Sequence, residues 1–250
     1  MMNFILLIIL LSLLIYTTGM HGIKLFFSLC LNFVLIVISF SIIAIGIDAR
    51  VIALLTCFII GRVVLYFLNG DNVKTKASTK SIVVVLLILI LSIFVMVNIS
   101  KIGGFSEEAY EEINMFEYEV GLKFSNISIA MILMCLIGAV IDSSVAISSA
   151  LYEVHINNKE LSKKELFNSG INIGKDILCT TLNTLLFAFI AEFMTLLIYY
   201  KTSSYTFLDI INSKLFSSEI IKITFSAIGC IIIIPVTSYI TSKEVKNINE

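Results

Sequence analysis

The chain has 250 residues, of which 58% are hydrophobic and 14% are charged, and its formal net charge is −1. A soluble domain carries about a quarter charged residues, so this sequence lacks the polar surface of a water-soluble globule. The mean hydropathy of +1.03 indicates that lipid surrounds most of the chain. A net charge so close to zero gives no sign of nucleic-acid binding.

Seven apolar runs approach the roughly 20 residues of helix that cross a bilayer. They lack the alternation of strands, so we expect one all-α integral membrane domain over residues 1–250. The first run has neither a basic start nor a cleavage site after it, which favours a retained helix. The expected transmembrane helices are 3–19, 22–46, 50–68, 81–100, 125–152, 175–199 and 218–239.

The distribution of lysine predicts the orientation, because short cytoplasmic loops are enriched in Lys and Arg. Lysines concentrate around the loops after the first, third, fifth and seventh runs. This asymmetry places the N-terminus outside and the C-terminus in the cytoplasm. The lysines of the richer side are Lys24, Lys74, Lys76, Lys80, Lys159, Lys163, Lys164, Lys175, Lys243 and Lys246.

Two loops have patterns of their own. Residues 101–122 repeat glutamates at helical spacing, which suits an amphipathic helix on the outer surface. In the loop after the fifth run, Ser162 and Glu165 form a capping-box pattern that opens a short helix. Gly170 and Gly174 predict a break before the sixth span, and His155 is interpreted as an exposed loop residue.

The five cysteines are scattered singly through apolar runs, without CxxC or metal-ligand spacing. We therefore interpret them as small buried hydrophobic residues and expect neither a metal nor a cofactor. They are Cys30, Cys57, Cys135, Cys179 and Cys230.

Asp142 is the strongest candidate for a functional residue. It lies about nine residues, or roughly 14 Å, from the inner end of its expected helix. An ionisable side chain at that depth costs at least ~2.5 kcal/mol, so it needs a partner or a purpose. Asp142 is accordingly a candidate proton or ion site. The alternative, a neutral aspartic acid that is hydrogen-bonded for structural reasons, remains open.

The residues around Asp142 predict a site between two helices. We expect Thr180, Asn183 and Thr184 of the next helix to face Asp142 at a similar depth, and Arg62 is a possible counter-charge. Glu192 is expected to reach the headgroups or another helix. Small residues on the Asp142 helix predict close packing against protein. These packing residues are Gly138, Ala139, Ser143, Ala146, Ser149 and Ala150.

The stretch from Gly138 to Leu185 resembles the YibE/F-like membrane proteins, and residues 104–109 are also similar. The sequence departs from the family pattern at Cys179 and Leu182. The resemblance implies a multi-pass protein of a bacterial-type cell membrane, with a YibE-like protein as one possible partner. The matching residues are Gly138, Ala139, Asp142, Ala146 to Ala150, Glu153, Leu166, Ser169, Gly170, Ile173, Gly174, Asp176, Thr181, Asn183, Thr184 and Leu185.

A more distant resemblance is to the RND superfamily and the SecD and SecF membrane domains. They also place a Gly-x-x-x-Asp helix before a charged loop and a helix rich in Asn and Thr. The resemblance implies that six of the helices form one half of an RND-type permease, with Asp142 as its proton-responsive residue. A second copy or a YibE-like partner then supplies the other half.

Three classes of function remain open. The first is a proton-coupled transport or translocation subunit, and the second is a non-catalytic scaffold or accessory subunit. An intramembrane aspartyl protease with Asp142 and Asp176 is disfavoured, because the sequence lacks the GxGD motif. We therefore expect no enzymatic activity, and the sequence names no substrate.

Overall fold

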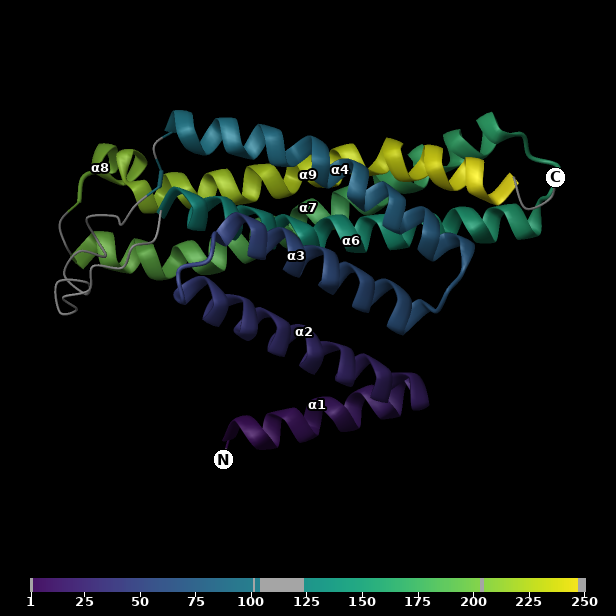
Figure 1. Cartoon of the computed structure of the whole chain (residues 1–250), viewed down its shortest axis with the longest axis horizontal. Helices are drawn as coiled ribbons and strands as arrows, with labels where there is room; N and C mark the ends of the chain where they lie inside the picture. The colour runs from purple at the N-terminus through teal and green to yellow at the C-terminus, as the bar shows by residue number, and fades with distance from the viewer. Residues whose placement is uncertain (1, 101, 104–123, 203–204, 247–250) are drawn as a thin grey trace.

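A computed structural model describes residues 2–100, 102–103, 124–202 and 205–246, which fold into helices (Figure 1). The predicted surface helix over 101–122 lies outside the described residues, apart from 102–103. In chain order the helices are α1 (Met2–Thr18), α2 (Met20–Ala44), α3 (Ala49–Arg62), its π-helical continuation η1 (Val63–Phe67), α4 (Val73–Ser100), α6 (Phe124–Asn157), α7 (Lys163–Thr202), α8 (Phe207–Asn212) and α9 (Lys214–Lys246).

Each of the seven predicted runs is helical. Six helices are long and apolar enough to cross a membrane, and a shorter apolar helix covers Phe4–Thr18. Several continue past the predicted bounds: α4 begins at Val73 and α7 at Lys163. Hydropathy marks only the part of a helix that sits in hydrocarbon, whereas the backbone hydrogen bonds continue into the polar ends.

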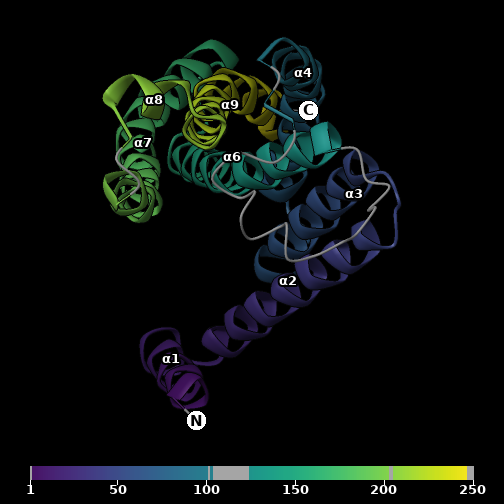
Figure 2. The same cartoon turned by 90° about the vertical axis from the view of Figure 1, so that its left-hand side faces the viewer.

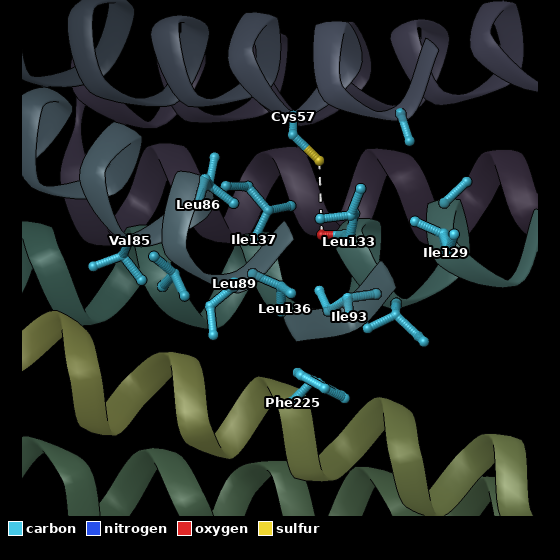
Figure 3. Close-up of a cluster of buried hydrophobic side chains, with 14 of the residues drawn as sticks. Cys57, Val85, Leu86, Leu89, Ile93, Ile129, Leu133, Leu136, Ile137 and Phe225 are labelled. Carbon is cyan, nitrogen blue, oxygen red and sulfur yellow. Dashed lines mark hydrogen bonds between the residues drawn. The ribbon is translucent and has the colours of Figure 1, made fainter. Parts of the chain in front are cut away.

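The core of the bundle is built around α6. This helix contacts α3, α4, α7 and α9 (Figures 1 and 2). Buried side chains from α3, α4, α6 and α9 form one hydrophobic cluster, which includes Leu136 of α6 and Phe225 of α9 (Figure 3). The Cys57 thiol of α3 donates to the backbone carbonyl of Leu133, with 3.7 Å between sulfur and oxygen. Burial therefore places α6 between the other helices of the bundle.

Hydroxyl groups join the same helices nearer the end of the bundle where the C-terminus of α9 lies. The Ser78 and Ser148 hydroxyls lie 2.6 Å apart and link α4 to α6. The Ser144 and Thr237 hydroxyls, 3.2 Å apart, link α6 to α9. Apolar packing distinguishes poorly between a neighbouring helix and lipid, so such polar contacts help to specify which helices pair.

The predicted break at Gly170 and Gly174 is wrong, because α7 runs unbroken from Lys163 to Thr202. Both glycines instead allow α7 to approach α9. A Cβ atom on Gly174 would lie 2.3 Å from Cγ2 of Ile234, and one on Gly170 would lie 2.6 Å from the Ser238 hydroxyl. The glycines therefore serve helix packing rather than helix termination.

The loop before α7 is only partly as predicted. The capping box is confirmed: the Ser162 amide donates to the Glu165 carboxylate across 2.8 Å, and the Glu165 amide donates to the Ser162 hydroxyl across 3.3 Å. The expectation for His155 is wrong, since it belongs to the last turn of α6 and is only 5% exposed. The longer α6 carries this residue into the packed end of the bundle.

The cysteine prediction holds in part. Cys57 and Cys230 are buried, whereas Cys30, Cys135 and Cys179 are exposed on the chain surface. In a membrane protein much of that surface faces lipid, so an apolar sequence context does not show that a residue is covered by protein.

Helices α1 and α2 form a hairpin that diverges from the bundle (Figures 1 and 2). The turn between them passes through Gly19, whose φ of 61° is a conformation that glycine adopts without steric cost. Near its other end, α2 is joined to α3 by the hydroxyls of Ser39 and Thr56, which are 2.5 Å apart. The hairpin thus meets the bundle mainly through α2.

Candidate functional site

Asp142 lies near the middle of α6, on a side of that helix that the rest of the chain leaves exposed. Its neighbours Ile141 and Ser143 point into the bundle and are 3% and 2% exposed. The carboxyl group is therefore outside the packed core, although it lies within a helix long and apolar enough to cross a membrane.

A cavity of about 460 Å³ separates Asp142 from the α1–α2 hairpin. It combines the Asp142 carboxyl group with the imidazole of His21, the hydroxyl of Thr18 and the amide of Asn69. His21 and Asn69 lie at helix ends, whereas Asp142 lies deep in α6. The full lining is Thr18, His21, Leu25, Val64, Leu68, Asn69, Asp142, Val145 and Ala146.

The predicted polar neighbours on α7 are not part of this cavity. Thr180, Asn183 and Thr184 are exposed on α7. The Thr180 hydroxyl donates to the carbonyl of Ile177 across 2.9 Å, and the Thr184 hydroxyl donates to the carbonyl of Thr180 across 3.0 Å. Both threonines therefore bond to their own helix, and the chain carries two separate polar surfaces within its apolar helices.

Arg62 is not brought into an ion pair with Asp142 in the part of the chain that the structure describes. Its guanidinium lies 4.6 Å from the ring centroid of Tyr66 and 5.9 Å from that of Phe58. Both rings belong to the same continuous helix as Arg62. Arg62, which is exposed on the chain surface, thus lies over aromatic rings of its own helix.

The small-residue face of α6 divides between core and surface. Ser143 is buried, Ala139, Ser149 and Ala150 are half-buried, and Gly138 and Ala146 are exposed. Gly138, Asp142 and Ala146 follow one another at four-residue spacing and form an exposed row. Among the residues that the structure describes, no atom outside α6 lies within 4 Å of a Cβ built on Gly138. The row leaves room for the backbone of another helix.

Sequence reasoning missed His21 as a companion of Asp142. The available signal was a lone histidine at the start of an apolar run, which alone does not indicate which helix it approaches. Among the residues that the structure describes, no three His, Cys, Asp or Glu side chains are grouped so as to hold a metal ion.

Comparison with known families decides where the chain belongs. The family model described as YibE/F-like protein matches residues 6–247, nearly the whole chain. The chain belongs to the YibE/F-like family. A search of curated proteins and a search of solved structures each found no match for this YibE/F-like chain.

The YibE/F-like motif residues occupy distinct positions in the fold. Gly170 and Gly174 hold α7 against α9, and Asp142 lines the cavity next to the α1–α2 hairpin. Asp176 and Asn183 lie exposed along α7. This YibE/F-like chain is thus a membrane protein whose motif residues both pack helices and place polar groups at the bundle surface.

Proposed function

We propose that the protein is a proton-coupled transport or translocation subunit that acts as one half of a dimer, with Asp142 as its proton-responsive residue. The observation that carries this proposal is the cavity that joins Asp142 to His21, Thr18 and Asn69. A carboxyl group exchanges protons only where water or a polar chain reaches it, and this cavity is large enough for several water molecules.

Histidine is suited to relay protons near physiological pH. His21 lies in the first turn of α2, near the end of the hairpin, so it is placed between the helix ends and Asp142. Protons would enter at His21 and reach Asp142 within the membrane. In this proposal the N-terminus is outside and the C-terminus is in the cytoplasm of a bacterial-type cell, so entry is from the cytoplasm.

The exposed row of Gly138, Asp142 and Ala146 supports the dimer. A carboxyl group whose cavity opens towards lipid is unfavourable, and the small residues on either side of Asp142 allow a second helix to close the open side of that cavity. We propose a second copy or a YibE-like protein as that partner, in an arrangement resembling the two halves of an RND-type permease. No enzymatic activity or cofactor is part of the proposal.

A non-catalytic membrane scaffold is the second candidate. It is favoured by α7, which exposes Asp176, Thr180 and Asn183 along one helix that would otherwise face lipid. In a scaffold such polar groups serve only to hold partner helices, and Asp142 has no need to exchange protons.

Dicyclohexylcarbodiimide, which attacks protonated carboxyl groups in apolar surroundings, tests the state of Asp142 without a known substrate. Membranes that contain the protein are treated over a range of pH, and the modified peptides are identified by mass spectrometry. We expect modification of Asp142 that decreases as pH rises, because the carboxyl group then loses its proton. Modification that is absent, or that stays constant with pH, contradicts proton exchange at this residue.

Proton uptake separates the two candidate functions. Asp142→Asn keeps the size and hydrogen-bonding capacity of the side chain but removes its titration. In reconstituted vesicles with an internal pH dye, we expect Asp142→Asn to abolish proton uptake while the protein still inserts and assembles. Asp176→Asn, which changes a carboxyl group outside the cavity, is the matched control. Unchanged uptake in Asp142→Asn contradicts the role of this residue, and wild-type uptake no greater than that of protein-free vesicles favours the scaffold.

A further inference from the structure

A second cavity, of about 430 Å³, lies between α2, α6, α7 and α9 near the end of the bundle that carries α8. Most of its wall is apolar, with Phe40 from α2, Met131 and Met134 from α6, and Phe189 from α7. Its volume falls in the range of small-molecule sites, which are about 300–1,000 Å³ and apolar with a few polar groups. The cavity is distinct from the one that Asp142 lines.

Three charged side chains line this apolar cavity. Glu219 and Lys222 of α9 form an ion pair, and their side chains are 13% and 16% exposed. Glu192 of α7 also lines the cavity and makes no hydrogen bond or ion pair with any residue that the structure describes. Two carboxylates and one ammonium group leave one negative charge without a partner in the cavity wall.

We propose that this cavity binds an amphipathic molecule with a compact apolar body and a single cationic group, which pairs with Glu192. A carboxylate beside apolar surface attracts a cation more strongly than it would in water, because fewer water molecules screen it. The rings of Phe40 and Phe189 suit the apolar body and can also face a cation. The ion pair of Glu219 and Lys222 keeps that ammonium group from neutralising Glu192.

The proposal is independent of proton coupling. The cavity receives residues from α7 and α9, and Asp142 is not among its lining residues. Loss of proton exchange at Asp142 would therefore leave this ligand site intact. Loss of ligand binding in this cavity would likewise leave proton exchange at Asp142 intact.

Two probes of nearly equal shape and opposite charge test the site. Tetraphenylphosphonium is a hydrophobic cation, and tetraphenylborate is its anionic counterpart. Binding of each to the purified full chain in a neutral detergent is measured by equilibrium dialysis, with protein-free micelles as the background. We expect saturable binding of one tetraphenylphosphonium per chain, and no saturable binding of tetraphenylborate.

Three variants locate the binding. Glu192→Gln removes the unpaired charge and is expected to weaken tetraphenylphosphonium binding about tenfold, which corresponds to ~1.4 kcal/mol. Ala188→Phe fills the cavity from α7 and is expected to abolish binding, since Ala188 lines the cavity and is exposed. Glu160→Gln removes a carboxylate in the turn before α7 and is expected to change nothing. Circular dichroism checks that each variant is folded.

Equal binding of the two probes overturns the role of charge, because it shows that only apolar surface is recognised. Tetraphenylphosphonium binding that is unaffected by both Glu192→Gln and Ala188→Phe overturns the site. A folded wild-type chain without saturable tetraphenylphosphonium binding overturns the proposal as a whole.

Discussion

Single residues set the distance between α7 and α9. Gly174 faces Ile234 so closely that a Cβ atom would overlap its Cγ2 atom at 2.3 Å. We expect Gly174→Ala to destabilise the fold by about 1–3 kcal/mol, the usual cost of overpacking. Most of this range exceeds the gain of roughly 1 kcal/mol that alanine brings to a helix interior, and the overlap at 2.3 Å favours its upper part. Thermal unfolding of the purified protein, followed by circular dichroism, measures the change.

Gly61→Ala is the matched control for that experiment. Gly61 is also buried and helical, but the nearest outside atom to a Cβ there is Cδ1 of Ile141 at 3.7 Å, an ordinary contact. This variant should unfold at the wild-type temperature or above it. If both variants lower the unfolding temperature equally, close approach at Gly174 is not the cause.

For Asp142, the sequence predicts the helix that carries the side chain but not the direction in which the side chain points. Its place within a long apolar helix follows from the run around it, and that helix is confirmed. Its direction does not follow, because helix periodicity needs a polar face as reference, and a helix in lipid has apolar residues on most sides. Position along the chain favours Thr180 and Asn183 as neighbours, whereas the structure places His21 and Asn69 in the cavity with Asp142.

At the scale of elements, the capping box at the N-terminus of α8 contains a carboxylate, so we expect the stability of this helix to depend on pH. The Thr206 amide donates to the Asp209 carboxylate across 2.9 Å, and the Asp209 amide donates to the Thr206 hydroxyl across 3.3 Å. Hydrogen bonds from the Thr206 hydroxyl and amide hold the pKa of Asp209 below its ordinary value. The stabilisation that these hydrogen bonds give to the folded helix is complete above the ordinary pKa of aspartate. It is lost as pH falls through the lower pKa of Asp209 in the folded state.

We therefore expect α8 to lose protection from amide hydrogen exchange below about pH 4, near and below the ordinary pKa of aspartate. Exchange rates of the α8 amides, corrected for intrinsic pH dependence, measure the effect. Asp209→Asn has no carboxylate to titrate, so its protection should not vary with pH in this range. The same pH dependence in both proteins would contradict a role for Asp209.

The existence of the long helices could be predicted, but their ends could not. Bilayer thickness sets a minimum apolar length, which located all seven runs. The capping box of Ser162 and Glu165 is a local signal and was also correct. Whether Gly170 and Gly174 end a helix or pack it depends on the residues opposite them on α9, and a single sequence does not show these.

At the scale of the whole molecule, the exposed row of α6 predicts a surface that a second copy covers. We expect native mass spectrometry of the gently purified protein to show a dimer. Gly138→Trp should convert it to a monomer, because the described residues of one chain leave the space around Gly138 open, and a partner helix packed there would close it. If native mass spectrometry instead shows a YibE-like protein bound to the chain, we expect that protein to contact the same row of Gly138, Asp142 and Ala146.

Leu91→Trp is the control, since Leu91 is 70% exposed on α4, away from the row. It should leave the dimer intact. A wild-type monomer, or a dimer that Gly138→Trp leaves unchanged, contradicts the proposed interface. The assembly itself lies beyond sequence reasoning, because exposed surface that meets lipid and exposed surface that meets a partner have similar composition.

The unbroken course of α7 has a mechanical consequence. A helix of 40 residues is about 60 Å long, roughly twice the thickness of the hydrocarbon layer. It carries Glu192 near one end, and Gly174 rests on Ile234 towards the other. Because α7 is unbroken, we expect it to move as one rigid element that tilts about that glycine contact. A molecule bound in the cavity beside Glu192 is then expected to displace the other end of α7, beyond Gly170, in the opposite direction.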